Sequence, residues 1–289
     1  MIMYNYKTMA NINELQRIST QVRRDIIRMV TNAKSGHPGG SMSCADFITA
    51  LYFDVMKHDP ATWTRQGKGQ DVFILSAGHL TPMYYSVLSR AGYFPLSELS
   101  TFRLLGTRLQ GHPCIETGLA GIVQASGSLG QGLSAAAGIA LGKKLDNESE
   151  KVYVMLGDGE CEEGQIWEAA MFAAHHKIDN LVAMVDWNRQ QIDGCVDNVA
   201  GLGNLEEKFK AFGWETIVAD GHDFTEILAA YDKAAALYGK GKPVVILFNT
   251  DMGHGVDFMA GTCEWHGKAT SPEQCERALA QLEETLGDF

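Results

Sequence analysis

The sequence lacks the features that mark several large protein classes. Its 289 residues contain no cysteine pair with CxxC spacing and no run of lysine or arginine longer than two residues. Zinc ligation therefore has little support, and the formal net charge of −11 argues against nucleic acid or an anionic membrane surface as a partner. No apolar stretch approaches the roughly 18 residues of a membrane-spanning helix. Apolar residues still make up 45% of the chain, which excludes disordered and fibrous classes.

The N-terminal segment also lacks a leader pattern, because no basic region there is followed by an apolar core. In a chain of this length without a leader, cysteines are expected to stay reduced. The sequence therefore predicts a cytoplasmic protein with free thiols at its six cysteines, which are Cys44, Cys114, Cys161, Cys195, Cys263 and Cys275.

Short apolar runs alternate with longer helical patterns along the chain. The predicted strands are Val72–Leu75, Val152–Leu156, Leu181–Asp186, Trp214–Val218 and Val244–Asn249. The predicted helices span residues 11–33, 44–56, 80–91, 130–145, 163–176, 204–212, 223–239 and 272–286. This alternation predicts an α/β three-layer sandwich, with a mainly parallel sheet and helices on both faces. We expect residues 1–289 to form one domain with an N-terminal helical extension, and the aperiodic stretch 106–131 to be functional.

Two polar motifs follow neighbouring predicted strands. Gly157-Asp158-Gly159 ends one strand, and Asn188 follows the next. In a parallel sheet both motifs lie at the carboxyl edge, where ligands bind. Asp158, Asn188 and a backbone carbonyl near Gln190 form an all-oxygen set that suits Mg²⁺ or Ca²⁺. The alternative interpretation of Gly-Asp-Gly alone is a tight turn with a capping aspartate.

Four of the nine histidines lie beside glycine or proline in loops, at positions 37, 79, 112 and 266. Imidazoles can hydrogen-bond sugar hydroxyls and move protons near neutral pH. A single histidine is more often a packed or surface residue, but four in glycine-flanked loops favour a shared site. The remaining five are interpreted as packing or surface residues, namely His58, His175, His176, His222 and His254.

The chain resembles the transketolase family. Gly157-Asp158-Gly159 with Asn188 thirty positions after Asp158 is similar to the thiamine diphosphate signature of that family. Further segments match in order over residues 11–270, namely Gly36–Gly40, Leu75–His79, Gln110–Pro113, Gly127–Gly132, Asp193-Gly194 and Trp265–Gly267. The resemblance implies the thiamine diphosphate-binding fold and places its diphosphate-binding domain in this chain.

The resemblance also implies a role for each matching residue. Asp158, Asn188 and the Gln190 carbonyl would hold Mg²⁺ or Ca²⁺. Contacts to thiamine diphosphate would come from His79, Gly127, Leu129, Asp158, Gly159, Asn188 and His266. The donor and acceptor sugars would meet His37, His112 and His266. Glu163 would join a carboxylate network at a subunit interface, although a glutamate in the first turn of a helix is an equally good interpretation of that residue alone.

Two domains of the family have no counterpart here, the pyrimidine-binding and the C-terminal domain. The resemblance therefore implies a split transketolase of sugar metabolism, in which a separate C-terminal subunit supplies the pyrimidine-binding domain in an α₂β₂ assembly. Such an enzyme would transfer a two-carbon ketol unit from a ketose phosphate to an aldose phosphate. His254 and Asp257 differ from the commoner residues of the family, so sugar preference is expected to differ.

Three alternatives stay open at this point. The chain could be the diphosphate-binding subunit of a 2-oxoacid dehydrogenase, or it could catalyse a reaction like that of deoxyxylulose-phosphate synthase. It could also be a non-catalytic orphan module that binds the cofactor.

Overall fold

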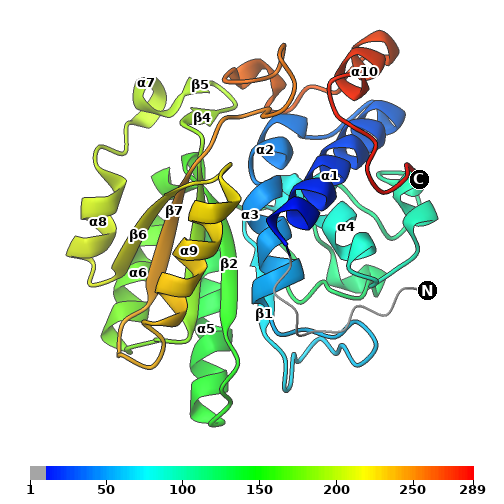
Figure 1. The fold of residues 1–289 in the computed structure, drawn as a ribbon. Helices are drawn as coiled ribbons and strands as arrows, with labels where there is room; N and C mark the ends of the chain where they lie inside the picture. The colour runs from blue at the N-terminus through cyan, green and yellow to red at the C-terminus, as the bar shows by residue number, and fades with distance from the viewer. Residues whose placement is uncertain (1–10) are drawn as a thin grey trace.

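A parallel sheet forms the centre of the computed structural model, which describes residues 11–289. Within these residues the sheet has five strands in the order β1-β2-β3-β7-β6, all parallel (Figure 1). The strands are β1 (Val72–Leu75), β2 (Val152–Gly157), β3 (Leu181–Trp187), β6 (Glu215–Asp220) and β7 (Val244–Asn249). The predicted α/β class with a mainly parallel sheet is confirmed.

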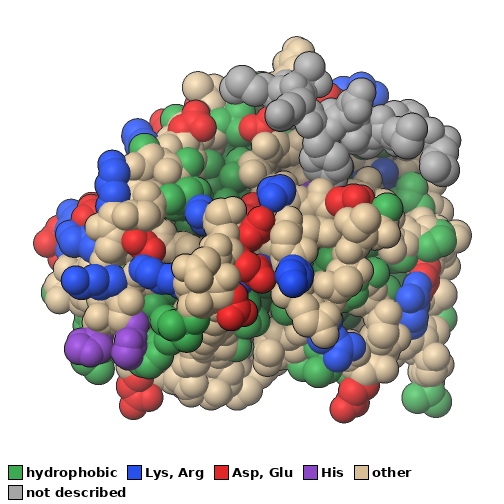
Figure 2. Space-filling view, turned by 90° about the horizontal axis from the view of Figure 1, so that it is seen from below, with side chains coloured by type: hydrophobic (Ala, Val, Ile, Leu, Met, Phe, Trp, Pro, Cys, Tyr) green, Lys and Arg blue, Asp and Glu red, His purple; other side chains and the backbone are tan. Residues whose placement is uncertain are grey.

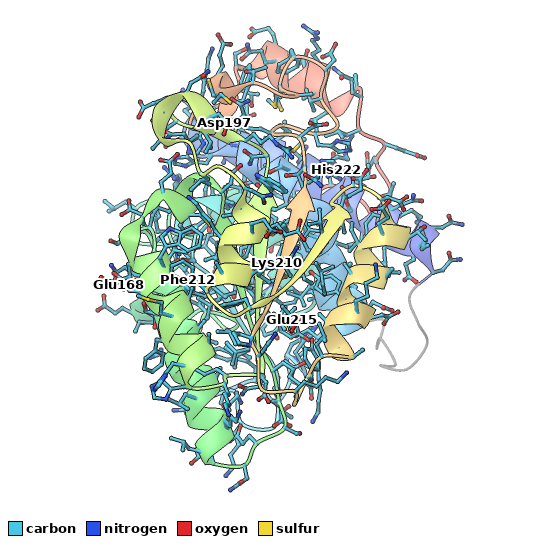
Figure 3. All side chains as sticks on the ribbon, turned by 90° about the vertical axis from the view of Figure 1, so that its left-hand side faces the viewer. Glu168, Asp197, Lys210, Phe212, Glu215 and His222 are labelled. Atoms are coloured by element: carbon cyan, nitrogen blue, oxygen red, sulfur yellow. The ribbon has the colours of Figure 1, made fainter. Side chains whose placement is uncertain are left out.

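Helices cover both faces of the sheet. One face carries α5 (Gln131–Leu145), α6 (Gly164–His175) and α8 (Leu205–Ala211). The other carries α1 (Ile12–Ala33), α3 (Ala45–Ala50), α4 (Thr81–Arg90) and α9 (Phe224–Ala235). Alternate residues of β1, β2, β3 and β7 enter opposite cores, so these strands need apolar residues throughout, whereas the edge strand β6 contributes to one core only. Figure 3 faces the β6 side, with Lys210 on α8 and Glu215 at the start of β6.

The remaining elements are short. They comprise α2 (Pro38–Ser43), α7 (Val196–Ala200), α10 (Pro272–Leu279) and a hairpin of β4 (Gln190–Gln191) with β5 (Gly194–Cys195). A π-helical turn, Leu51–Val55, continues α3, so the predicted helix 44–56 is two segments. Five 3₁₀ turns lie at Gly78–Leu80, Leu96–Thr101, Ile115–Thr117, Gly159–Glu162 and Cys263–Trp265.

The C-terminal helix is shorter than predicted. The sequence pattern extends it to residue 286, whereas α10 ends at Leu279. The Arg24 side chain on α1 donates to the carbonyl oxygens of Leu279 and Leu282 at 3.0 and 2.6 Å, and pairs with Asp288 at 2.7 Å. These bonds draw residues 280–289 along α1 and replace the helical hydrogen bonds that a longer α10 would make.

The sequence analysis expected neither a leader segment nor a membrane-spanning helix, and the structure bears on these two expectations differently. Residues 1–10, which carry most of the segment interpreted as lacking a leader, lie outside the described residues. None of the helices in residues 11–289 combines the length and the apolar character needed to cross a bilayer. Figure 2 shows acidic and basic side chains interspersed on the visible face rather than gathered into one basic field.

Candidate active site

A cavity of about 440 Å³ lies at the carboxyl ends of β2 and β3. All of the site residues predicted from the sequence line it, which are His37, His79, His112, Gly127, Leu129, Asp158, Gly159, Glu163, Asn188, Gln190 and His266. They come from seven separate segments of the chain, so the fold gathers them. Their individual roles stay predictions.

Asp158 lines this cavity and is 2% exposed. It follows the last residue of β2, and its carboxylate accepts the backbone N–H of Gly159 at 2.8 Å and that of Arg189. Burial, and next the nearby charge of Asp186, raise the pKa of Asp158 to about 8. No lysine or arginine side chain forms an ion pair with Asp158 within residues 11–289. An unpaired buried carboxylate is costly, and a divalent cation would pair with it.

Asn188 presents its amide oxygen at the same edge. Its Nδ2 donates to Asp186 Oδ2 at 2.8 Å, and its Oδ1 accepts the N–H of Gln190 at 2.9 Å. The first bond fixes which end of the amide faces Asp186, and a carbonyl oxygen has a second lone pair for a ligand. Gly157 pairs with Asp186 across β2 and β3, so the prediction that both motifs meet at one sheet edge is confirmed.

Asp186 is a cavity residue that the sequence analysis left without a role. It is 1% exposed and accepts the hydroxyl groups of Ser43 and Thr250 as well as the Asn188 amide. Burial raises its pKa. Its position at the end of a predicted buried strand was the available signal, because a carboxylate there must face the ligand edge or be hydrogen-bonded.

Glu160 was also missed, and it joins three parts of the cavity wall. Its carboxylate accepts the Ser76 hydroxyl, the Gly130 N–H at 2.9 Å and the Gly157 N–H at 3.1 Å. Burial raises its pKa, while these three donors favour its charged form. Glu160 therefore ties the loop before α5 to the ends of β1 and β2.

Three imidazoles form a compact cluster above the carboxylates. Ring centroids are 4.9 Å apart for His37 and His79, 5.6 Å for His37 and His266, and 5.1 Å for His79 and His266. Burial is the main cause that lowers the pKa of all three, to about 4 for His37. The Nδ1 atoms of His37 and His266 are buried and have no hydrogen-bond partner within the described residues. These neutral rings therefore offer unused donor and acceptor positions to a ligand.

The irregular stretch 106–130 supplies the remaining histidine. His112 lies against Gly127, where a Cβ atom would come within 3.1 Å of its ring at a backbone φ of +151°. Burial, and next the Arg103 charge, lower the pKa of His112. The dihedral angle favours glycine at 127, and a side chain there would also require the His112 ring to shift by a few tenths of an ångström.

Glu163 lies exposed at the edge of the cavity. It precedes α6 with extended backbone angles, and its side chain makes no capping hydrogen bond to that helix. The interpretation of Glu163 as a glutamate within the first helical turn is thus not what the structure shows. Its carboxylate stays available to a ligand or a second chain.

Comparison with known proteins gives a consistent result. The family model described as "Transketolase, thiamine diphosphate binding domain" matches residues 15–287. The chain is 41% identical to the 6-deoxy-6-sulfo-D-fructose transketolase subunit SqwG of Clostridium sp. (strain MSTE9), over 93% of this chain and 98% of that subunit. It is 36% identical to one of the subunits of the apulose-4-phosphate transketolase of Phocaeicola vulgatus, over 95% of this chain and 96% of that subunit.

Solved structures of longer proteins also match. The chain superposes on transketolase from Campylobacter jejuni with a TM-score of 0.87 and 34% identity, covering 94% of this chain and 43% of that chain. The chain thus spans less than half of that one-chain relative but nearly all of the two subunits. These matches favour transketolase over the alternatives of a 2-oxoacid dehydrogenase and a deoxyxylulose-phosphate synthase.

Proposed function

The chain belongs to the transketolase family as the thiamine diphosphate-binding subunit of a two-subunit enzyme, and from this premise we propose its reaction and the roles of its residues. With a separate partner chain, it transfers a two-carbon ketol unit from a ketose phosphate or related acidic ketose to an aldose phosphate. The observation that carries the proposal is the cavity itself. It combines an unpaired buried carboxylate with a cluster of neutral imidazoles.

The oxygen ligands at the bottom of the cavity fit a divalent cation. Asp158, the Asn188 amide and the Gln190 carbonyl would hold Mg²⁺ or Ca²⁺, with diphosphate oxygens among the remaining ligands. The fit is supported by the burial of Asp158 without an ion pair and by the hydrogen bond that orients Asn188.

The cofactor would lie between this metal site and the histidines. Bound thiamine diphosphate supplies the carbanion chemistry of the reaction. The Gly159 backbone would lie beside the diphosphate, as a helix-type N-terminus favours anions. His79 and His266 would donate to the diphosphate side, and Gly127 and Leu129 would contact the ring system.

The remaining side chains would act on the sugars. His37, His112 and His266 are neutral, so each can donate through one ring nitrogen and accept through the other. They would bind sugar hydroxyls and move a proton at Nδ1 or Nε2. The Nδ1 atoms of His37 and His266 are buried, and the exclusion of water there strengthens each hydrogen bond, whereas His112 is exposed.

Arg103 supports an acidic substrate. Its Nη1 donates to Ser35 Oγ at 2.7 Å, its buried Nε has no partner within the described residues, and its backbone φ is +59°. Its charge helps to lower the pKa of His37 and His112 after the larger effect of burial, so it lies near both. The names of the two relatives give a sulfonated and a phosphorylated sugar. Arg103 is not among the residues that line the cavity, so we infer that its charge attracts the sulfonate or phosphate of the sugar from beyond the lining.

The partner would complete the site. A C-terminal transketolase subunit would supply the pyrimidine-binding domain and its glutamate, in an α₂β₂ assembly. Glu163, exposed at the cavity edge, would face that subunit. We place this assembly in the cytoplasm.

The test is a donor survey with the chain, a candidate C-terminal subunit, Mg²⁺ and thiamine diphosphate. Ketose phosphates and sulfonated ketoses should both be cleaved, and an Arg103→Met variant should raise KM for these acidic donors far more than for a neutral ketose. Cleavage of pyruvate with a lipoyl acceptor, without ketol transfer, would overturn the proposal. No activity with any donor, although the two subunits form a complex, would favour the alternative of a non-catalytic module that only binds the cofactor.

A further inference from the structure

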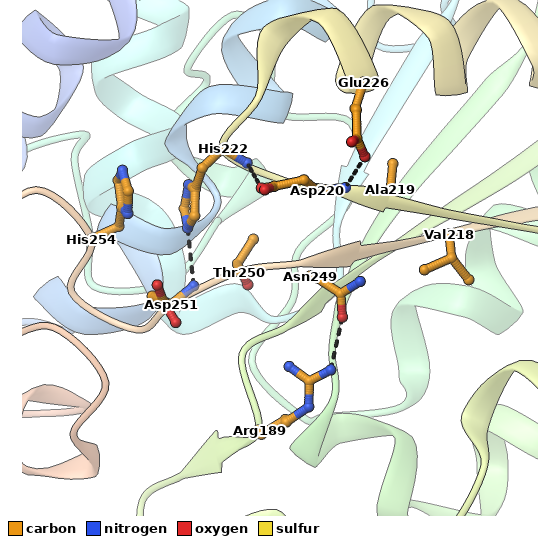
Figure 4. Close-up of a pocket in the computed structure, with 10 residues that line it drawn as sticks. All are labelled: Arg189, Val218, Ala219, Asp220, His222, Glu226, Asn249, Thr250, Asp251 and His254. Atoms are coloured by element: carbon orange, nitrogen blue, oxygen red, sulfur yellow. Dashed lines mark hydrogen bonds between the residues drawn. The ribbon is translucent and has the colours of Figure 1, made fainter.

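A second cavity, of about 520 Å³, lies at the carboxyl ends of β6 and β7 (Figure 4). One imidazole in its wall joins two separate parts of the protein. His222, in the turn between β6 and α9, has its Nδ1 2.9 Å from Asp46 Oδ2. Its Nε2 accepts the backbone N–H of Asp251 at 3.0 Å, the contact drawn in Figure 4.

We propose that Asp46 and His222 are positioning residues that hold the loop 250–256 after β7 and thereby set one wall of the cofactor cavity. Neither residue lines the first cavity. The inference rests on the proposed function, because that function makes the first cavity the cofactor site.

Asp46 provides a fixed anchor. It lies on α3, is 4% exposed, and receives both terminal nitrogens of Arg23 at 2.7 Å as well as the Ser19 hydroxyl. Burial alone would raise the pKa of Asp46, but the Arg23 guanidinium holds it well below its ordinary value. The carboxylate is therefore a permanent anion that can accept one more hydrogen bond.

The Asp46 carboxylate determines which ring nitrogen of His222 carries the hydrogen. An anionic Asp46 accepts a hydrogen from Nδ1, which leaves the lone pair on Nε2. The Asp251 backbone can only donate, so it requires that lone pair. Both contacts are satisfied by a neutral ring with its hydrogen on Nδ1.

The loop held in this way contributes directly to the cofactor cavity. Thr250, just before Asp251, donates to Asp186, and Met252, just after it, lines the cavity. The Gly253 N–H donates to the Gly39 carbonyl at 2.9 Å. A shift of Asp251 would therefore move Thr250 and Met252, which flank it on both sides.

His254 packs against the ring of His222. Its ring stacks on His222 with centroids 3.5 Å apart and an angle of 11° between the planes. Burial, and next the Arg23 charge, lower the pKa of His254 to about 4, so the ring stacks as a neutral group.

The same residues group as possible metal ligands, but their contacts oppose a metal ion. Both nitrogens of His222 are already hydrogen-bonded, and Asp46 is paired with Arg23. Parallel stacked rings also direct their lone pairs side by side rather than toward one point. We therefore assign these residues to positioning and not to metal binding.

Two variants separate the two bonds of His222. The amide of His222→Gln reaches the position of Nε2 and keeps an acceptor for Asp251, whereas His222→Asn replaces Nδ1 and keeps only the bond to Asp46. Val218→Thr, in the wall of the same cavity and 40% exposed, is the matched control, because the Val218 side chain takes no part in the contacts of His222. Hydrogen exchange of residues 250–256 and the apparent Kd for thiamine diphosphate at fixed Mg²⁺ are measured on the full chain with its partner subunit.

We expect His222→Asn to speed exchange of residues 250–256 and to raise the apparent Kd about tenfold, with His222→Gln within about threefold of the parent. Unchanged hydrogen exchange in a folded His222→Asn variant would show that the bond from His222 to Asp251 does not hold the loop 250–256. Faster exchange with an unchanged Kd would show that this loop does not set the wall of the cofactor cavity. An equal loss of cofactor affinity in His222→Asn and His222→Gln would also refute the positioning role. So would tight Zn²⁺ binding by the parent protein that both variants abolish. If the parent complex binds no cofactor, the proposed function fails, whereas the exchange data still test the bond from His222 to Asp251.

Discussion

The charges of individual side chains determine which ions the cofactor cavity favours. Five carboxylates line it, Asp158, Glu160, Glu162, Glu163 and Asp186, and the described lining includes neither lysine nor arginine. Low-dielectric walls with charges of one sign concentrate the field inside a cleft. A divalent cation is the partner that such a cavity favours, and Asp158 is a buried carboxylate in it that has no ion pair within residues 11–289.

The first prediction concerns Asp158. Replacing it by asparagine keeps the size of the side chain and removes the charge that would pair with the metal. We expect Asp158→Asn to weaken the binding of Mg²⁺ and thiamine diphosphate by about 100-fold or more, since even supporting residues at metal sites change affinity by roughly 10- to 100-fold. Calorimetry with both ligands measures this effect.

The control is Asp257→Asn, a change at an exposed carboxylate paired with Arg277 on the surface. It should leave both affinities unchanged. Parental cofactor affinity in Asp158→Asn would show that the metal ligands are assigned wrongly.

The second prediction concerns pH. The pKa of His37 is about 4 in the folded protein, where burial is the main cause, compared with about 6.5 in an unfolded chain. Between these values the unfolded state binds more protons, so stability falls as the pH decreases from 6.5 toward 4. The slope from one such group is at most about 1.4 kcal/mol per pH unit, and solvent near the partly exposed ring reduces it.

Urea midpoints between pH 7 and pH 4.5 test this expectation. His37→Asn should flatten the decline, whereas His175→Asn, at an exposed position of α6, should leave it as steep as in the parent. Identical slopes in all three proteins would mean that His37 is not held neutral by burial.

At the scale of elements, the wall of the cavity depends on how Glu160 connects β1, β2 and the loop before α5. Glu160→Gln would place an amide nitrogen where donors from Ser76, Gly130 or Gly157 now point. A buried donor without an acceptor costs about 1–3 kcal/mol. We expect the free energy of unfolding to decrease by that amount and cofactor affinity to decrease with it.

Denaturant titration and cofactor binding measure these two effects. Glu207→Gln, on the exposed side of α8, should change neither. A Glu160→Gln protein with parental stability would mean that the three donors are satisfied in another way.

The same elements show what the sequence could and could not reveal. Asp158 and Asn188 were predictable, because parallel strands bring their carboxyl ends to one edge whatever lies between them. Glu160 was not, because several acidic residues follow Gly159 and only the 3₁₀ turn decides which one is buried. Nor was the end of α10, since the bonds of Arg24 to a segment more than 250 positions away override the local helical pattern.

At the scale of the whole molecule, one large apolar side chain in the cavity lining is exposed to solvent. Ile192 lines it and is 63% exposed, and the exposed Glu163 belongs to the same lining. A single exposed apolar side chain is ordinary on a protein surface, so Ile192 is a candidate contact only because it lines the cavity that the proposed partner subunit would complete. The partner subunit proposed above would cover Ile192 and would close the cavity against water.

The last prediction follows from that cover. The chain alone should show no ketol transfer above background, and the mixture with its C-terminal partner should be active. Ile192→Asp should weaken the complex about tenfold or more, because a charge would then be buried at the contact. Light scattering after gel filtration and titration of activity with partner subunit measure both effects. Leu145→Asp, at the far end of α5, is the matched exposed control.

Activity of the chain alone would mean that it needs no second domain. Unchanged assembly of Ile192→Asp would place the partner elsewhere while leaving the reaction intact. A complex that forms normally but transfers no ketol unit from any acidic ketose would separate assembly from catalysis. Cofactor binding by the same complex would then show whether the metal site or the sugar site is at fault, because the proposed metal site includes Asp158 and the proposed sugar site is formed by His37, His112 and His266.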